Sequence, residues 1–270
     1  MTPGTAPRRA RASTVGPARN VVVAGKRAVA EAIRAGATSE VLLADGATRT
    51  QGMREVLQAA AVAQVPVRSV PRAELDAQAT HHQGVVAHVR APSLRSLSER
   101  ELAAYPFGLD AIAVVLDGVT DPQNLGAAAR SADAAGVSML ITRTRRAADV
   151  TPAAIRASAG ALLHLPHARV ANISRAIERL QEAAFTVVGL AGDADVGIYD
   201  HPCPPGRIAL VAGDEGRGLS RLARERCDVV VSIPMRGRVS SLNASASLAA
   251  ALYGYILPSR AAGSGVGTRR

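Results

Sequence analysis

Residues 111–126 have the sequence AIAVVLDGVTDPQNLG, in which an unbroken apolar run is followed by a polar turn. An apolar run without polar interruption is typical of a strand that is buried on both faces, as in a parallel sheet. Residues 125–135 then have the composition of a helix, and Gly136 is a suitable residue to end it. This strand–turn–helix unit predicts an α/β fold.

The same alternation continues through the C-terminal half of the chain. Apolar runs predict strands at residues 138–142, 186–190, 208–212 and 229–233, and the intervening segments predict helices at 152–158, 173–184, 219–226 and 243–257. Strands that alternate with helices form mostly parallel sheets with helices on both faces. We therefore predict an α/β domain with a mostly parallel sheet over residues 110–258.

A smaller α/β unit is predicted at residues 20–91, where shorter apolar runs alternate with helical segments. Residues 92–109 are polar and predict a linker with a helical turn or two. Residues 1–19 and 259–270 contain several arginines and no acid, and we predict that both are basic disordered tails. They carry seven of the ten net positive charges, which suits either contact with RNA phosphates or a solubilising role.

Composition excludes several classes of protein. The two cysteines, Cys203 and Cys227, make neither a disulfide framework nor a metal quartet, so we expect a reducing cytoplasm and no bound metal. The basic N-terminus has no apolar segment behind it, and no apolar stretch reaches about 18 residues, so neither a signal peptide nor a membrane span is expected. The sequence has no GxxxxGKS/T loop and no GxGxxG after the first long strand, which disfavours the common nucleotide-binding folds.

Three loops at predicted strand ends contain an unusual concentration of glycine and polar residues. The first contains Asn124, and the helix after it carries Arg130. The second contains Gly213 and Glu215, and the third, residues 233–243, reads IPMRGRVSSLN. Ligands of parallel sheets bind beyond the carboxyl ends of the strands. The three loops together therefore favour a ligand site.

Each loop also has a purely structural explanation. Asn124 suits a helix N-cap, and Arg130 can pair with Asp133 one turn later. The glycines of the second loop can serve tight turns, and Ser241 or Asn243 can cap the last helix. The occurrence of all three loops at neighbouring strand ends is what favours the ligand site over these separate explanations.

The three loops resemble, in order and spacing, the motifs of the SpoU (TrmH-type) branch of the SPOUT RNA methyltransferases. The family motifs are an Asn and an Arg at fixed spacing, a Gly-x-Glu-Gly loop, and Ile-Pro-Met followed by Ser-Leu-Asn. They are matched here by Asn124 and Arg130, by Gly213, Glu215 and Gly216, and by Ile233, Pro234 and Met235 with Ser241, Leu242 and Asn243. The resemblance covers about residues 111–257.

The resemblance implies a deep trefoil knot in the C-terminal third, a homodimer with its active site at the subunit interface, and S-adenosylmethionine as methyl donor. It also implies the roles of individual residues. Cofactor contacts are expected at Gly213, Ile233, Met235 and Leu242, and the catalytic machinery is expected to comprise Asn124, Arg130, Glu215, Ser241 and Asn243.

The role of Arg130 needs physical interpretation, because the family's motif Arg is often regarded as the general base. A guanidinium has a pKa above about 12 and keeps its proton in proteins. We interpret Arg130 as an electrostatic clamp on the substrate phosphate and the developing alkoxide. Proton removal then passes through phosphate, water or Glu215.

Residues 20–91 resemble the family's small substrate-binding module, which is related to ribosomal protein L30e, through the stretches GKRAV (25–29) and HQGVV (82–86). Since the C-terminal domain has little basic surface to spare, we expect this module to bind folded RNA. Its expected RNA contacts are Lys26, Arg27, His81, His82 and Gln83. A solvated turn is the alternative explanation for His81 and His82.

The same stretches, with residues 116–122, resemble most closely the branch that methylates a guanosine ribose of 23S ribosomal RNA. Two alternatives within the class are a transfer RNA substrate and another ribosomal nucleotide, as in some antibiotic-resistance enzymes. An alternative of a different class is a non-catalytic RNA-binding or ribosome-assembly protein on this scaffold, which the intact motif residues disfavour.

Overall fold

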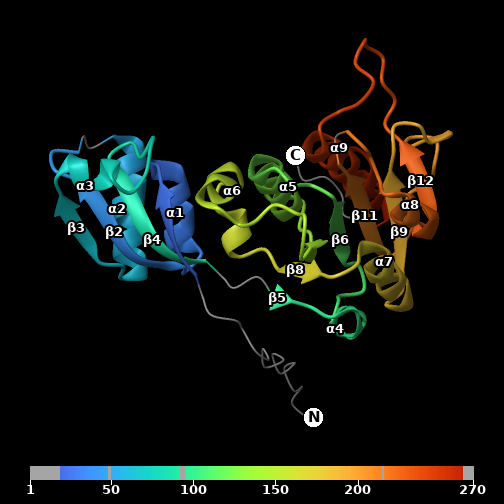
Figure 1. The fold of residues 1–270 in the computed structure, drawn as a ribbon, viewed down its shortest axis with the longest axis horizontal. Helices are drawn as coiled ribbons and strands as arrows, with labels where there is room; N and C mark the ends of the chain where they lie inside the picture. The colour runs from blue at the N-terminus through green and yellow to red at the C-terminus, as the bar shows by residue number, and fades with distance from the viewer. Residues whose placement is uncertain (1–18, 48–49, 92–94, 215, 264–270) are drawn as a thin grey trace.

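The computed structural model describes residues 19–47, 50–91, 95–214 and 216–263, which fold into two α/β units side by side (Figure 1). The predicted α/β class is confirmed. Both expected tails lie largely outside the described residues, as does Glu215. None of the helices within the described ranges is long and apolar enough to cross a membrane.

The N-terminal unit is built on a four-stranded sheet of mixed direction. Its strand order is β1-β4-β2-β3, in which β4 runs antiparallel to both neighbours and β2 runs parallel to β3. The helices α1 and α2 pack on one face of the sheet, and α3 packs on the other. The bounds are β1 Arg19–Ala24, α1 Lys26–Arg34, β2 Thr38–Ala44, α2 Gln51–Ala63, β3 Val67–Val70, α3 Arg72–Asp76 and β4 Val85–Ala91.

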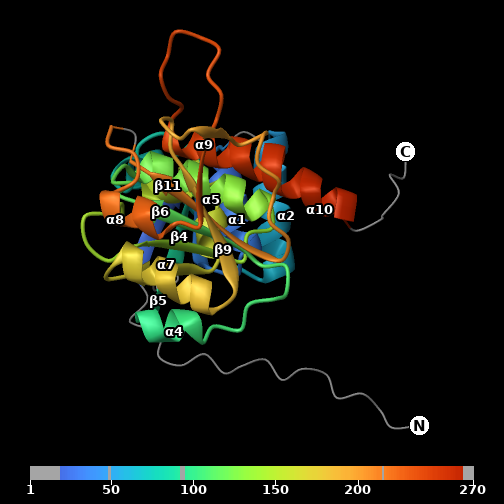
Figure 2. The ribbon, with the colours of Figure 1, turned by 90° about the vertical axis from the view of Figure 1, so that its right-hand side faces the viewer.

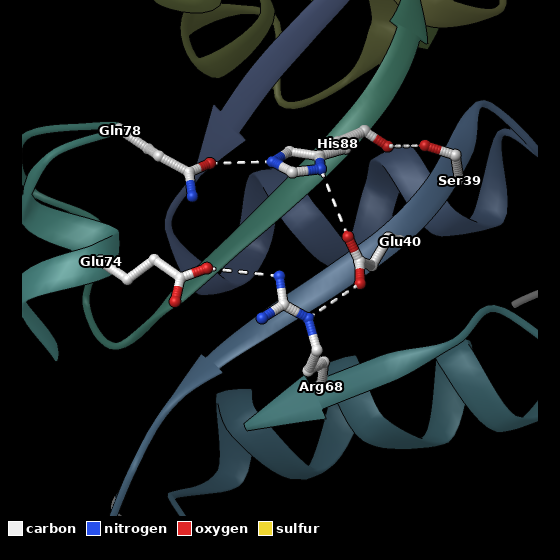
Figure 3. Close-up of polar contacts among 6 residues, drawn as sticks. All are labelled: Ser39, Glu40, Arg68, Glu74, Gln78 and His88. Atoms are coloured by element: carbon white, nitrogen blue, oxygen red, sulfur yellow. Dashed lines mark hydrogen bonds and ion pairs between the residues drawn. The ribbon is translucent and has the colours of Figure 1, made fainter. Parts of the chain in front are cut away.

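The polar part of this sheet is held by a network of charged side chains (Figure 3). The Arg68 guanidinium donates to Glu40 and to Glu74, each at 3.2 Å. His88 lies between Glu40, at 3.4 Å, and the side chain of Gln78, at 2.8 Å. Arg68 is therefore neutralised by two carboxylates and is a poor candidate for phosphate binding.

The C-terminal unit is an eight-stranded sheet of order β10-β12-β9-β11-β6-β7-β8-β5, whose described pairs are all parallel. The strands are β5 Arg95–Ser96, β6 Ile112–Asp117, β7 Met139–Arg143, β8 His167–Val170, β9 Phe185–Leu190, β10 Val196–Gly197, β11 Arg207–Gly213 and β12 Val229–Ser232. Every residue of β6 is buried, as its unbroken apolar sequence predicts.

Helices cover both faces of this sheet. The helices α5 and α9 pack on one face, and α4, α7 and α8 pack on the other. The bounds are α4 Glu99–Ala103, α5 Pro122–Ala134, α6 Pro152–Ala157, α7 Ile173–Glu182, α8 Arg221–Arg226, α9 Ala244–Ala251 and α10 Leu257–Gly263, with a 3-10 turn at Ala161–Leu163 and a π-helical turn at Leu252–Ile256. Figure 2 shows the connection from β12 to α9 projecting from the body of this unit.

The structure corrects two of the predicted boundaries. The predicted linker at residues 92–109 contains α4, as expected, but also β5, which pairs with β8 and so extends the C-terminal sheet. The predicted tail from residue 259 begins instead as helix, because α10 continues to Gly263. Polar composition suggested a linker and a tail, whereas pairing with an edge strand and continuation of a helix depend on tertiary neighbours.

The two units pack against each other through α6 and the turn after it, which lie between α1 and α5 in Figure 1. Ile155 and Leu163 are buried in the core of the N-terminal unit. Gly160 has a φ of +91°, and a Cβ on it would lie 2.6 Å from Cβ of Glu31 on α1. This close approach of the two units leaves no room for a side chain at position 160.

Candidate cofactor pocket and active site

A cavity of about 550 Å³ lies at the carboxyl ends of β9, β11 and β12. This is the edge at which parallel sheets bind ligands, and the volume is in the range of small-molecule sites. Its walls come from three separate stretches of chain, within residues 190–193, 212–219 (without 215) and 233–247, together with Arg224 of α8. The lining residues are Leu190, Ala191, Gly192, Asp193, Ala212, Gly213, Asp214, Gly216, Arg217, Gly218, Leu219, Arg224, Ile233, Met235, Ser240, Ser241, Leu242, Ala244 and Ser247.

The wall after β11 is a tight loop held by its own backbone. Asp214 and Gly218 exchange two backbone hydrogen bonds of 3.1 and 2.8 Å, and the Asp214 carboxylate accepts from the amide of Gly216 at 3.0 Å. A Cβ on Gly213 would lie 2.1 Å from the carbonyl carbon and oxygen of Gly218. Only glycine fits at position 213, because the two sides of the loop touch there.

The wall after β12 is anchored by Asn243. Its side-chain amide donates to the Asn124 side-chain oxygen at 2.8 Å. The Asn243 side-chain oxygen accepts from the backbone amide of Ser245 at 2.8 Å, which makes Asn243 the N-cap of α9. The first and third predicted motifs therefore meet in space. Asn243 also caps the helix, as the purely structural explanation predicted, so it has both roles.

The wall after β9, residues 190–193, was missed in the sequence. Asp193 accepts from the Arg224 guanidinium at 2.6 Å, and this hydrogen bond is the main reason that the pKa of Asp193 lies below its usual value. The pair joins the β9 loop to α8 across the cavity rim. Only one feature of the sequence could have indicated this wall, namely that residues 190–193 follow a predicted strand. Their composition is that of an ordinary loop.

A buried carboxylate is hydrogen-bonded to the chain next to the β11 wall of the cavity. Asp117, at the end of β6, is 3% exposed and accepts from the Arg143 guanidinium at 2.7 Å and from the backbone amide of Ser220 at 2.8 Å. Ser220 directly follows the loop that forms the β11 wall. Asp117 thereby ties the ends of β6 and β7 to that wall.

The predicted site residues are distributed as follows. Five of them line the same cavity: Gly213, Ile233, Met235, Ser241 and Leu242. Asn124 and Asn243 are hydrogen-bonded to each other, outside the cavity lining. Arg130 is exposed on α5 and is not among the lining residues. Glu215 lies outside the described residues, between Asp214 and Gly216 of the lining.

The two N-terminal stretches expected to bind RNA lie next to each other. The backbone amide of Lys26 donates to the Gln83 side chain at 3.4 Å, and the Lys26 ammonium donates to Thr50 at 3.0 Å. Arg27, His81 and Gln83 are exposed, and His81 and Gln83 have φ values of 57° and 53°. These residues form one polar surface at the start of α1.

His82 is the exception, and its predicted RNA contact is corrected. The side chain is 3% exposed, its Nε2 lies 2.8 Å from a carboxylate oxygen of Asp76, and its Nδ1 accepts from the amide of Gly84 at 3.0 Å. These partners place the proton on Nε2 and leave no ring nitrogen for RNA. His82 shapes the turn from inside, and the solvated-turn alternative applies to His81 alone.

Within the described ranges, no group of three or more His, Cys, Asp or Glu side chains is arranged to hold a metal ion. The two cysteines are both free thiols. Burial is the main reason that the pKa of Cys227 is raised to about 12.

A parallel α/β sheet with a cavity at its carboxyl edge, joined to a small α/β module, is the arrangement of a two-unit ligand-binding α/β protein. Comparison with known families identifies both units. Residues 111–253 match the SpoU rRNA Methylase family, and residues 22–95 match the module described as RNA 2'-O ribose methyltransferase substrate binding. The chain belongs to the SpoU rRNA methylase family.

Relatives of known sequence agree with this membership. An uncharacterized tRNA/rRNA methyltransferase of Mycolicibacterium vanbaalenii is 40% identical, with 83% of this chain and 72% of that protein covered. The 23S rRNA (guanosine-2'-O-)-methyltransferase RlmB of Escherichia coli is 45% identical over 64% of this chain and 70% of its own length.

Solved structures are similar over both units. A crystal structure described as an RNA 2'-O ribose methyltransferase has a TM-score of 0.75 and 29% identity, with 90% of each chain covered. The SpoU methyltransferase AviRb from Streptomyces viridochromogenes, solved in complex with the cofactor AdoMet, has a TM-score of 0.71 and 30% identity over 91% of this chain and 92% of its own.

Proposed function

We propose that this chain transfers a methyl group from S-adenosylmethionine to a ribose 2′-hydroxyl of RNA, and that its substrate is a guanosine of 23S ribosomal RNA. The observation that carries the proposal is the convergence of the predicted second and third motifs on one cavity, with the first motif hydrogen-bonded to the third. The guanosine assignment draws on the likeness to the RlmB enzymes and on the matched substrate-binding module.

The cavity residues fit S-adenosylmethionine. Leu190, Leu219, Ile233 and Leu242 offer apolar walls for an adenine ring, and the glycine-rich β11 loop exposes backbone groups at close range. Asp193 offers a carboxylate at the rim, and the pKa of Asp193 is lowered by Arg224, so it is charged at neutral pH. When bound, the cofactor supplies an electrophilic methyl group on a sulfonium, which needs no metal for activation.

The chain's own residues would bind, orient and deprotonate the ribose. We assign Ser241, Asn243 and Asn124 to holding the third-motif loop and the ribose in line with the methyl donor, since correct alignment contributes much of the rate. Arg130 serves as the clamp on the substrate phosphate and the developing alkoxide. Proton removal passes through phosphate, water or Glu215.

We propose that the active enzyme is a homodimer in which each site takes Arg130 from the second copy. Support comes from the exposure of Arg130 away from the cavity of its own chain. Support also comes from Tyr199 and Tyr253, which are 62% and 49% exposed and lie around Gly254 of the C-terminal helices. Exposed aromatic side chains are common at subunit interfaces.

Two further family features are part of the proposal. We propose that the C-terminal segment is threaded as a trefoil knot, which is compatible with β9 lying between β11 and β12 in the sheet. We also propose that residues 20–91 act as the RNA-binding domain, with Lys26, Arg27, His81 and Gln83 as contacts, and that the protein works in the cytoplasm, where ribosomal RNA is found.

The experiment that tests the function is methyl transfer to defined RNA. The purified protein is incubated with S-adenosylmethionine and either a 23S ribosomal RNA transcript or a transfer RNA pool, and 2′-O-methyl positions are mapped. We expect a single new methyl on a guanosine ribose of the 23S transcript. Methylation of transfer RNA, or of another ribosomal nucleotide, would replace the guanosine assignment, and no methyl on any RNA would leave a non-catalytic RNA-binding protein.

The homodimer has its own test. Arg130→Ala and Gly213→Ala subunits are each expected to be inactive, since one lacks the clamp and the other lacks the cofactor pocket. When the two are co-expressed, a site shared between copies restores part of the activity, because one intact site forms in each mixed dimer. Inactive mixed protein would show that Arg130 serves its own chain.

A further inference from the structure

We propose that the loop from β7 to α6, residues 143–149, is a second phosphate-binding surface for the RNA substrate, with Arg145 and Arg146 as its contacts. This inference rests on the proposed function, since it concerns the same RNA. From the sequence, the N-terminal unit is predicted to supply the basic surface and the C-terminal unit to have little to spare. The geometry of this loop points to a different distribution.

The two arginines are free to bind an anion. Both side chains are exposed, and within the described part of the chain neither forms an ion pair. Two acids in or bound to this loop, Asp149 and Asp117, have other partners. Asp117 is engaged by Arg143 at 2.7 Å, and Asp149 is engaged by Arg169 at 2.7 Å. Arg145 and Arg146 therefore present two uncompensated charges.

The backbone next to these side chains is braced by hydrogen bonds. Arg169, whose side chain is only 18% exposed, donates to the carbonyl oxygens of Arg143 and Thr144 at 3.3 and 2.8 Å. The backbone amide of Thr144 donates to Val170 at 2.8 Å. Arg146 has a φ of 56°, a left-handed conformation in which the chain reverses. A braced loop loses less conformational entropy on binding than a mobile one.

The same loop is coupled to the cofactor cavity. Arg143 binds Asp117, and Asp117 accepts from the amide of Ser220, next to the β11 wall. The amide of Ala148 donates to the carbonyl of Val119 in the first motif loop at 2.9 Å. In the sheet, β7 is two strands from β11, which corresponds to about 10 Å between their ends.

The loop also lies between the cavity and the N-terminal unit. Its last residues lead into α6, which packs against that unit and lies between α1 and α5 in Figure 1. An RNA strand held by Lys26 and Arg27 at one end and entering the cavity at the other would pass the β7–α6 loop. Guanidinium groups that meet phosphates position the strand without reading its sequence.

Three other arginines differ from Arg145 and Arg146 in their partners or in their position. Arg68 lies between two carboxylates on the N-terminal sheet (Figure 3), and Arg226 pairs with Glu178 at 3.1 Å. Arg100 is exposed on α4, which both views place at the lower edge, far from the β12–α9 connection. Neither Arg100 nor Arg226 lines the cavity, so the two supply a control that removes the same charge from outside it.

The test compares the Arg145→Ala/Arg146→Ala variant of the full-length protein with the Arg100→Ala/Arg226→Ala control. The probe is a 23S ribosomal RNA transcript, and its Kd is measured by filter binding over a range of KCl concentrations. We expect the Kd to rise about tenfold and the slope of log Kd against log salt to fall by about 1.5, because two phosphate contacts no longer release counterions. The KM for the transcript should rise with little change in kcat, and the control should match the wild type.

Cofactor binding separates a folding defect from a loss of RNA contact, since the Kd for S-adenosylmethionine should be unchanged in both variants. A Kd and salt slope for RNA equal to those of the control would overturn the proposal. Because the binding measurement does not require methyl transfer, it also distinguishes this outcome from failure of the proposed function. If the proposed function were wrong, the wild type would bind the transcript but transfer no methyl group to it.

Discussion

The side-chain amides of Asn124 and Asn243 meet at 2.8 Å, although 119 residues separate them in the chain. Asn243 donates its amide N–H to Asn124 and uses its oxygen to cap α9 through Ser245. One residue therefore starts α9 and also joins it to the first turn of α5. The contact explains why the third motif contains Asn at this position, since an amide donates and accepts at once.

Substitutions at Asn243 separate these two roles. Asn243→Asp keeps the capping oxygen but loses the amide donor to Asn124, so we expect a small change in stability and a large loss of methyl transfer. Asn243→Ala loses both and should also lower the free energy of unfolding by about 1 kcal/mol. Urea denaturation and single-turnover methylation of a 23S transcript measure the two effects. Near-wild-type turnover in the Asp variant would remove the role assigned to this contact.

Asp117 is expected to affect cofactor affinity from outside the cavity. Asp117→Asn leaves the Arg143 guanidinium without its anion and weakens the contact to Ser220. Breaking a buried pair costs about 3–5 kcal/mol, and the cost here should be about 2–3 kcal/mol because the Arg143 side chain is 34% exposed. The Kd for S-adenosylmethionine, measured by calorimetry, should rise along with the loss of stability.

Asp149→Asn is the matched control for Asp117→Asn. It breaks the pair with Arg169, but the Asp149 side chain is 57% exposed, so the cost should be about 1 kcal/mol or less. Cofactor affinity should stay at the wild-type value, since Asp149 has no contact with the β11 wall among the described residues. Equal effects of the two substitutions on cofactor binding would show that Asp117 has no special role in supporting the cavity.

Much of the fold follows from the sequence because it depends on local patterns. The buried strands β6 and β11 are apolar without interruption, and α6 begins at residue 152 as predicted. The helix α5 begins at Pro122, three residues before its predicted start, with Asp121 rather than Asn124 as its N-cap. Periodicity and capping act over a few residues, so they can be interpreted without neighbours. Parallel pairing then follows from the alternation of strands and helices.

Features that depend on distant partners could not be predicted. His82 has the appearance of a surface residue in sequence, yet Asp76 and the Gly84 amide satisfy both of its ring nitrogens inside the fold. The β9 wall of the cavity contributes mainly backbone and apolar surface, so no motif marked it. In the sequence, nothing distinguishes Arg145 and Arg146 from other arginines. Only the structure shows that their loop contacts the first motif loop.

Gly213 is expected to tolerate no side chain. A Cβ added in Gly213→Ala would lie 2.1 Å from the Gly218 carbonyl, so the loop must open. We expect loss of S-adenosylmethionine binding by at least about tenfold, because the cavity wall moves while the rest of the sheet is unaffected. Gly237→Ala is the control in the neighbouring loop, since a Cβ there meets no atom within 4 Å and should leave binding unchanged. Calorimetric titration of both variants is the measurement.

His167 should make the stability of the protein depend on pH. The ring is buried on β8 beside Thr142, with its Nε2 2.9 Å from the hydroxyl, and burial, aided by the charge of Arg169, lowers the pKa of His167 to about 3. Between about pH 6.5 and 3 the unfolded chain therefore binds a proton that the folded chain excludes. The contribution of neutral His167 is complete above about pH 6.5 and is lost as the pH falls, with a slope of up to about 1.4 kcal/mol per pH unit.

The test of this dependence is urea denaturation of wild type and His167→Leu at several pH values from 6.5 to 4.5. The variant should lose part of the acid-side slope, because it has no group at this position to protonate on unfolding. Thr142→Val provides the control, since it removes the hydrogen bond but keeps the imidazole buried. It should lower stability by about 1 kcal/mol at every pH and retain the slope. Identical slopes for wild type and His167→Leu would mean that His167 binds its proton equally in the folded and unfolded states, contrary to the effect expected from its burial.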